Sequence, residues 1–356
     1  MKYKTTIKNQ YGVTLIELMI AVIISLMITA AIVYLFSTMV GSYHVQGNII
    51  KLQEDARFMT DAITKELRMS DYGGCRGIGS IDSSGEDAIK QKFLLDNSLA
   101  WDNSSKLKTI RGYKCSGDNS DTCGYKNNTT ALSSIDSDQK FETKQGMDSI
   151  IIRRMSEKTS SVIAFQKITP SVGDKTYKIT TNGKFNTTGN ISDFSNGDII
   201  IISDCDKLAI GKINTVNSIQ TEIIIKPTAA NFDDTLSFEA GAMIAKLKSS
   251  LFYVNENGRL VKRTIKSGSF TKDEDVEIQE NIIIDGFSID YGIDKSDPAD
   301  QVPDKIIKAD QIEENDWEKV VMLRINLSMS AEKGGPHEVA RAYSTTVNLR
   351  NMHIKK

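Results

Sequence analysis

An apolar run near the N-terminus, with a single charge at its start, constrains this chain more than any other feature. Residues 18–40 are 23 consecutive positions without a charged side chain, and Glu17 comes directly before them. At 1.5 Å of rise per residue, a helix of this length crosses the roughly 30 Å hydrocarbon core of a bilayer. Because a carboxylate is costly inside a membrane, we predict that Glu17 is functional.

The residues ahead of this run predict its orientation. They include Lys2, Lys4 and Lys8 and no acidic residue. By the positive-inside rule, the lysines keep the N-terminus in the cytoplasm, and the rest of the chain crosses the membrane. A secretory signal peptide has a shorter apolar core followed by small residues at its cleavage site. Here the small residue, Gly12, comes before the run instead, which leaves a plain signal anchor as the alternative to a processed helix.

A close resemblance to the cleavage and methylation site of type IV prepilins, and of their type II secretion relatives, lies in the sequence GVTLIEL at residues 12–18. The resemblance implies that a prepilin peptidase cuts after Gly12 and releases residues 1–12 as a leader peptide. The mature chain would begin at Val13 with a free or methylated amine. An unpaired buried charge costs several kcal/mol, so Glu17 is expected to pair with the terminal amine of a neighbouring subunit and fix its register.

The helix is predicted to continue beyond the membrane as an amphipathic segment over residues 41–74. Its apolar stripe recurs at steps of three and four and comprises Val45, Ile49, Leu52, Ala56, Met59, Ile63 and Leu67. Polar side chains on the other face are Lys51, Asp55, Thr64, Lys65 and Arg68. Gly41 and Gly47 predict a bend or melted turn where the helix leaves the bilayer, and Gly73 and Gly74 predict its end.

The head is predicted to combine a loop-rich segment with a β-rich domain. Residues 75–147 are rich in Ser, Asp, Asn, Gly and Lys and read as a variable excursion that builds no core. Residues 148–356 contain β-rich runs, which we predict as strands at 149–153, 161–168, 198–203, 208–216, 222–226, 242–255, 260–265, 276–291, 319–330 and 338–349. Residues 255–258 predict a hairpin turn. The expected fold is α+β, with a long N-terminal hydrophobic helix packed on a large antiparallel β-sheet head.

Four cysteines, all on the predicted periplasmic side, can pair in three ways. We favour Cys75 with Cys205, which would tie the end of the helix to a strand, and Cys115 with Cys123, which would close a short loop. No close CxxC spacing indicates a zinc site, and no metal or cofactor is expected. Lys and Arg total 44 against 46 for Asp and Glu, so no overall charge indicates a nucleic-acid partner.

Several further stretches are similar to the PilW family of type IV pilus minor pilins. They lie at residues 52–58, 67–75, 197–205, 251–254, 258–261, 289–294, 317–325 and 346–351. The resemblance implies a minor pilin that acts in initiation and in the tip complex of a type IV pilus, with roles in adhesion or twitching motility. Implied partners are the major pilin, PilV-, PilX-, PilE- and FimU-like minor pilins, a PilY-type tip adhesin and the prepilin peptidase. The implied location is the inner membrane, with one pass and a periplasmic head, and then the pilus.

Two other classes of function remain open at this stage. One is a J-type pseudopilin of type II secretion, which has a similar build. The other is a membrane-anchored periplasmic binding or hydrolytic protein, although no GxSxG or HExxH motif occurs and no enzyme is expected. Asp294, Asp297 and Asp300 could hold calcium, but their spacing lacks the glycine and terminal glutamate of an EF-hand, so a solvated loop is favoured.

Overall fold

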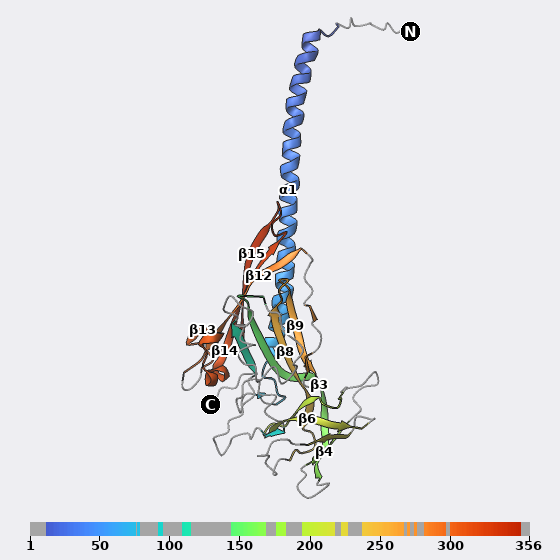
Figure 1. Cartoon of the computed structure of the whole chain (residues 1–356), viewed down its shortest axis with the longest axis vertical. Helices are drawn as coiled ribbons and strands as arrows, with labels where there is room; N and C mark the ends of the chain where they lie inside the picture. The colour runs from blue at the N-terminus through green and yellow to red at the C-terminus, as the bar shows by residue number, and fades with distance from the viewer. Residues whose placement is uncertain are drawn as a thin grey trace, which may run out of the picture.

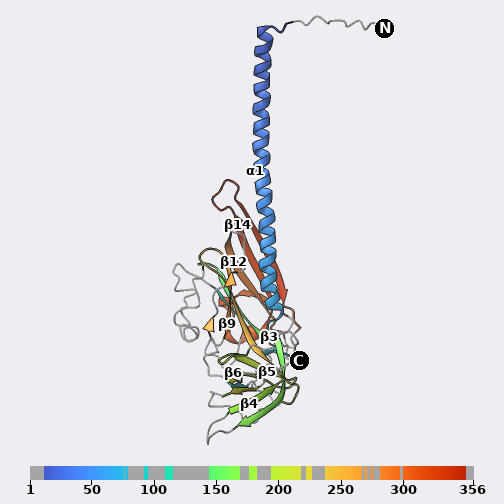
Figure 2. The same cartoon turned by 90° about the vertical axis from the view of Figure 1, so that its right-hand side faces the viewer.

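The chain forms a long helix that stands on a head made of two β-sheets (Figure 1). This computed structural model describes residues 12–75, 77–78, 92–94, 109–114, 144–168, 176–182, 194–217, 222–226, 237–266, 269–270, 274–275, 281–296 and 300–349. Helix α1 (Leu15–Arg68) is about 80 Å long at 1.5 Å per residue. Its N-terminal half projects away from the head, and its C-terminal half packs against it (Figures 1 and 2).

The larger sheet has eleven strands in the order β10-β9-β8-β5-β6-β7-β4-β3-β2, with β1 paired to β6 and β11 paired to β9. The strand bounds are β1 (Lys92–Leu94), β2 (Ile110–Lys114), β3 (Asp148–Ile168), β4 (Thr176–Thr181), β5 (Ile199–Ser203), β6 (Leu208–Val216), β7 (Glu222–Ile225), β8 (Met243–Val254), β9 (Leu260–Lys266), β10 (Ser269–Phe270) and β11 (Glu274–Asp275). All these pairs are antiparallel except β1 with β6.

Part of the larger sheet closes on itself at the end of the head farthest from the N-terminus. Strand β8 pairs with both β5 and β3, so the pairings β3-β4-β7-β6-β5-β8-β3 form a ring. Closing the ring removes free strand edges and encloses a core that includes Tyr177, Ile202, Ile225 and Phe238. This barrel-like lobe lies at the bottom of Figure 1, where β4 and β6 are labelled.

The smaller sheet holds the helix. Its four antiparallel strands follow the order β13-β12-β14-β15, with bounds β12 (Ile282–Ile293), β13 (Lys305–Lys308), β14 (Val320–Ala331) and β15 (Val339–Asn348). Two short 3-10 helices, η3 (Ala309–Gln311) and η4 (Glu314–Lys319), connect β13 to β14. The apolar stripe of α1 packs on β14 and β15, and Leu52, Met59, Ile63 and Leu67 are all at most 1 % exposed. The expected stripe is therefore confirmed.

Three hydrogen bonds join β12 to residues in or next to the strands of the larger sheet. The backbone N–H of Ile284 donates to the carbonyl of Gly258 at 2.9 Å, and the ammonium of Lys144 donates to the carbonyl of Ile284 at 2.8 Å. The N–H of Ile289 donates to the buried carboxylate of Asp148 at 2.7 Å. Because buried backbone groups need partners, these contacts fix how the two sheets meet.

Helix α1 is continuous through Gly41 and Gly47, so neither glycine is the site of a melted turn. The turn between β14 and β15 supports the helix at this level. The rings of His44 and His337 stack with centroids 5.3 Å apart, and the side-chain amide of Asn48 donates to the carbonyl of His337 at 3.1 Å. Packing against a neighbouring element compensates the weak helix propensity of glycine.

The helix also ends earlier than expected, at Arg68 instead of Gly73–Gly74. The chain turns at Asp71, which has φ 64° and donates its N–H to the carbonyl of Arg153 in β3 at 3.1 Å. Aspartate is one of the few non-glycine residues that tolerate this left-handed conformation. The contact with β3 therefore directs the chain away from the helix before the glycines are reached.

Most expected strands are present, with two kinds of difference. Segments 149–153 and 161–168 are the two ends of one strand, β3, whose register with β8 shifts between Met155 and Thr159. Outside the excursion, four strands were not expected, because their sequences contain no long apolar run: β4, β10, β11 and β13. The hairpin at 255–258 is confirmed: Gly258 has φ 71°, and the side-chain oxygen of Asn255 accepts a hydrogen bond from the N–H of Arg259 at 2.9 Å.

The segment at 75–147 contributes to the core, contrary to expectation. Within it, β2 pairs with the start of β3 along all five of its residues. Ile110 and Met147 are 1 % and 3 % exposed and belong to the same apolar cluster as the helix stripe. Single buried apolar residues in a polar segment give no periodic signal, which explains why the sequence analysis missed them.

Candidate functional site: the exposed half of the helix

Gly12 and Val13 lie just before α1, and Glu17 lies in the first turn of the helix. Thr14 is the N-cap residue, and its hydroxyl oxygen accepts a hydrogen bond of 3.4 Å from the N–H of Glu17. The carbonyl of Thr14 accepts from the N–H of Leu18 at 3.2 Å. This cap leaves Gly12 and Val13 as an extended segment before the helix, and it places Glu17 in the first turn, where the helix dipole favours a negative charge.

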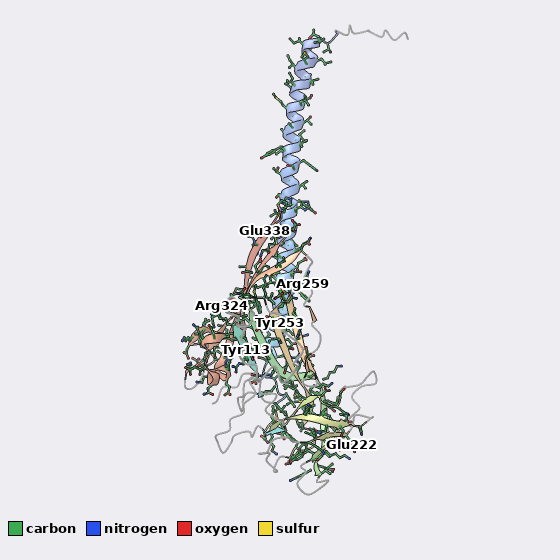
Figure 3. All side chains as sticks on the ribbon, viewed as in Figure 1. Tyr113, Glu222, Tyr253, Arg259, Arg324 and Glu338 are labelled. Carbon is green, nitrogen blue, oxygen red and sulfur yellow. A yellow bond between two sulfur atoms is a disulfide. The ribbon has the colours of Figure 1, made fainter. Side chains whose placement is uncertain are left out.

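From residue 12 to residue 40, every residue of this segment is exposed. We call residues 13–40 the exposed helix segment. No other part of the described chain buries its large apolar side chains. Their exposed fractions run from 40 % at Val40 to 78 % at Leu15. Figure 3 shows these side chains radiating from a bare helix. An apolar surface of this size marks a membrane or protein interaction site.

Three hydroxyl groups of the exposed helix segment donate hydrogen bonds within the helix. The hydroxyl of Ser25 donates to the carbonyl of Val22 at 2.9 Å, that of Thr29 to the carbonyl of Ser25 at 2.8 Å, and that of Thr38 to the carbonyl of Leu35 at 2.8 Å. Lipid offers no hydrogen-bonding partner, so such internal bonds suit a helix that lies in a bilayer. Among the described residues, α1 is the helix that is long and apolar enough to span a membrane.

Glu17 is the exception, because the described part of the chain gives its carboxylate no cation. The carboxylate is exposed in the single chain and would lose its water in a membrane or a helix bundle. A carboxylate that loses water without a partner is costly, so Glu17 would need a cation from outside the described residues.

Two protein-family models match this chain. The prokaryotic N-terminal methylation motif matches residues 7–33, which include Gly12, Val13 and Glu17. The model described as Type IV Pilus-assembly protein W matches residues 251–348, which run from the end of β8 through β15. Over these two stretches the chain is similar to type IV pilins of the PilW family. The matched families point to a structural protein rather than an enzyme.

Comparison with individual proteins adds little to this assignment. No curated protein sequence matches the PilW-like chain. Among solved structures, a type IV-like pilin from Thermus thermophilus is similar over 44 % of this chain and 85 % of its own length, with 10 % identity and a TM-score of 0.20. The assignment rests on the two family models.

The PilW match coincides with the sheet that holds the helix. All four strands of the smaller sheet lie within residues 251–348, whereas β1 to β7 of the larger sheet lie outside them. The PilW-like part is thus the platform for α1, and the motif match covers the start of α1 itself. The N-terminal motif and the apolar helix fit membrane anchoring and pilus incorporation.

Near the C-terminal end of α1, a buried ion cluster joins the helix to the larger sheet of this PilW-like chain. The carboxylate of Glu66 accepts from Arg154 at 2.7 Å, from Lys248 at 3.0 Å and from Lys262 at 2.9 Å. Arg154 also pairs with Glu157 at 2.8 Å. Burial would raise the pKa of Glu66, but these three cations together lower it to about 2.

The sequence analysis missed this cluster, although a signal was present. Glu66 lies three residues after Ile63 and seven after Met59, and so falls on the apolar stripe of the helix. A charge on a buried stripe needs an opposite charge from another element. Asp55, assigned to the polar face of the helix, is also buried.

The structure describes two of the four cysteines that were predicted to form disulfides. Cys75 and Cys205 form a disulfide, with their Cα atoms 5.0 Å apart, between the segment after α1 and the turn after β5. Cys115 and Cys123 lie outside the described residues. This bond adds a covalent link beside the ion cluster, so the end of the helix is held at two points.

The acidic loop after β12 is organised by its own backbone. The carboxylate of Asp294 accepts hydrogen bonds from the N–H groups of Ser296, Asp300 and Gln301 at 3.0, 3.1 and 2.8 Å. Asp297 lies outside the described residues, which contain no cluster of three or more metal-ligating side chains. The oxygens of Asp294 therefore already have donors. Three aromatic residues, Phe252 of β8 and Phe287 and Tyr291 of β12, are buried at 0 to 1 % exposed.

Proposed function

We propose that this PilW-like chain is a minor pilin that prepilin peptidase cuts after Gly12 and that then takes part in the initiation and tip complex of a type IV pilus. Before assembly it would sit in the inner membrane through residues 13–40, with its head in the periplasm. After assembly it would lie in the pilus at the cell surface, with a role in adhesion or twitching motility.

The observation that carries this proposal is the combination of a bare apolar helix with a single acid at its start. The exposed helix segment has no covering element within the described chain, and Glu17 has no cation there. A bundle of similar helices would cover the apolar surface, and the terminal amine of a neighbouring subunit would supply the cation. We propose that Glu17 and this amine pair during assembly and set the axial position of the subunit.

The size of the head supports a place at the start or tip of the fibre. The described part of the head contains fifteen strands, and its barrel-like lobe extends well beyond the end of α1 (Figure 2). Such a head would crowd a lattice in which every subunit repeats it. We therefore propose contacts with the major pilin, with PilV-, PilX-, PilE- and FimU-like minor pilins and with a PilY-type tip adhesin.

The test is the fate of Glu17 variants in cells. Glu17→Gln keeps the shape of the side chain and removes its charge, and Glu54→Gln is the matched control because Glu54 is an exposed glutamate later in the same helix. We expect Glu17→Gln to be cut and to reach the membrane at normal levels, but to be lost from sheared pili, as measured by immunoblot. Deleting the gene should lower the number of pili without changing the helical repeat of those that remain.

Two outcomes would count against the proposal. One is a Glu17→Gln chain that enters pili as well as the Glu54→Gln control. The other is a normal number of pili in the deletion strain, counted by electron microscopy.

A further inference from the structure

Strand β15 ends the smaller sheet with a long open edge. It pairs with β14 over ten residues without a register shift, and no strand of the described chain pairs with its other side. Unpaired strand edges are templates for pairing with another chain, and natural proteins guard them with short strands, lysines, prolines or bulges. The opposite edge strand, β13, is guarded in this way: it has four residues, two of them lysines.

The hydrogen-bond register identifies which backbone groups of β15 point outward. The N–H of Leu349 donates to the carbonyl of Val321, so odd-numbered residues face β14 in this antiparallel pair. The even-numbered residues then direct both N–H and C=O away from the sheet, and all of them are exposed: Ala340, Ala342, Ser344, Thr346 and Asn348. Five residues thus present ten backbone groups, and no described backbone group bonds to them.

The composition of β15 contains little that guards its edge. The five outward residues are small or polar, uncharged and free of proline, and Arg341 is the charged residue of the strand. At about 3.4 Å per residue, they span roughly 27 Å, which matches a partner segment of about eight or nine residues. We define these five residues as the open edge.

We propose that the open edge of β15 receives an extended strand from a different subunit of the pilus assembly, by β-strand addition. The inference rests on the proposed function, because the exposed helix segment would hold the two subunits side by side. β15 runs along α1, and Glu338, which directly precedes β15, lies beside the helix above the head (Figure 3). A neighbour bound along α1 therefore lies next to the open edge.

A second copy of this chain does not fit the edge symmetrically. Identical edges related by a two-fold axis across the strands pair antiparallel. Because β15 and α1 run in the same direction, this pairing would point the two helices in opposite directions. Both helices could not then enter the same membrane, so two β15 edges do not pair with each other, and we assign the strand to another kind of subunit.

The test removes one outward N–H without touching the β14 pairing. Ala342→Pro does this, since proline lacks the N–H and is tolerated on edge strands. Ala342→Val is the matched control, because it keeps the N–H and enlarges the side chain on the same face. Ala342→Lys provides a second variant should the proline variant fail to accumulate, because lysine is a residue with which natural proteins guard strand edges. Each full-length chain is expressed in cells and quantified in membranes and in sheared pili.

We expect Ala342→Pro to lower the amount of the chain in pili about tenfold, the effect of one lost buried hydrogen bond. Ala342→Lys should also lower this amount, because it places a charge at the pairing edge, and Ala342→Val should stay at wild-type level. Hydrogen exchange of the purified full-length chain in detergent should be fast at the open edge and slow at Arg341, Tyr343 and Thr345. Slow exchange at the open edge of the isolated chain would overturn the proposal. So would normal incorporation of Ala342→Lys, or equal losses for proline and valine.

Failure of this inference can be told apart from failure of the proposed function. If Glu17→Gln is lost from pili while Ala342→Pro and Ala342→Lys enter them normally, assembly occurs without strand addition. If Glu17→Gln enters pili normally, the proposed function itself fails.

Discussion

Replacing Glu66 with glutamine should destabilise the head strongly, because the change leaves Arg154 buried without its counter-charge. The side chains of Glu66 and Arg154 are only 6 % and 2 % exposed. Removing one partner of a buried ion pair costs about 3–5 kcal/mol, since the remaining charge stays out of water. The cluster also spans three elements, α1, β3 and the β8–β9 hairpin, so its loss should loosen the helix from the larger sheet.

The pKa of Glu66 gives an independent estimate. A carboxyl with a pKa of about 2 in the folded protein and 4.5 otherwise contributes about 3 kcal/mol to stability at neutral pH. Because the folded pKa is the lower one, the contribution is complete above pH 4.5 and disappears as the pH falls to about 2. This value lies within the range of about 3–5 kcal/mol expected for breaking the buried pair.

The assay is urea unfolding of the full-length chain in detergent, followed by far-UV circular dichroism at pH 7 and at steps down to pH 2.5. We expect Glu66→Gln to lower the free energy of unfolding by about 3 kcal/mol at pH 7 and to remove part of the wild-type loss on acidification. Glu54→Gln, at an exposed position of the same helix, serves as the control and should match wild type. If Glu66→Gln stays within about 0.5 kcal/mol of wild type at pH 7, the reasoning is refuted.

Three further predictions concern the head. Burial raises the pKa of Asp148, so the charged carboxylate costs stability, and this stability is regained as the pH falls. Asp148→Asn still accepts the hydrogen bond from the N–H of Ile289 and should be at least as stable as wild type at pH 7. A clear loss of stability in urea unfolding would contradict this. Gly258→Ala should cost about 2 kcal/mol or more in the same assay, because φ is 71° and a Cβ would meet β12 at 2.5 Å; a neutral effect would exclude the strained turn. Replacing Cys75 and Cys205 together with serine should lower stability by about 4–5 kcal/mol, since the bond closes a loop across 130 positions, and an unchanged urea midpoint would argue against it.

The sequence predicts the helix and its two halves well, because both depend on local patterns. A charge-free run and a stripe at steps of three and four define the exposed and buried parts of α1, and the stripe from Leu52 to Leu67 is buried as expected. The β-rich runs likewise fall in observed strands. The division of these strands into two sheets was not predicted, because pairings such as β8 with both β3 and β5 join segments that are distant in the sequence.

The features that the sequence analysis missed depend on contacts between distant segments. The end of α1 is set by Asp71 meeting β3, and the continuity through Gly41 is supported by His337, almost 300 residues later. Glu66 could have been singled out by its place on the stripe, but its three cations come from β3, β8 and β9. The open edge of β15 becomes visible only when the sheet order is known.

The most direct test of the central claim is the N-terminal residue and mass of the chain recovered from sheared pili. The account predicts a chain that begins at Val13, with or without one methyl group on its amine, because only a cut after Gly12 places a free amine four residues before Glu17 at the exposed end of the helix. A chain in pili that still begins with Met1 would contradict the account.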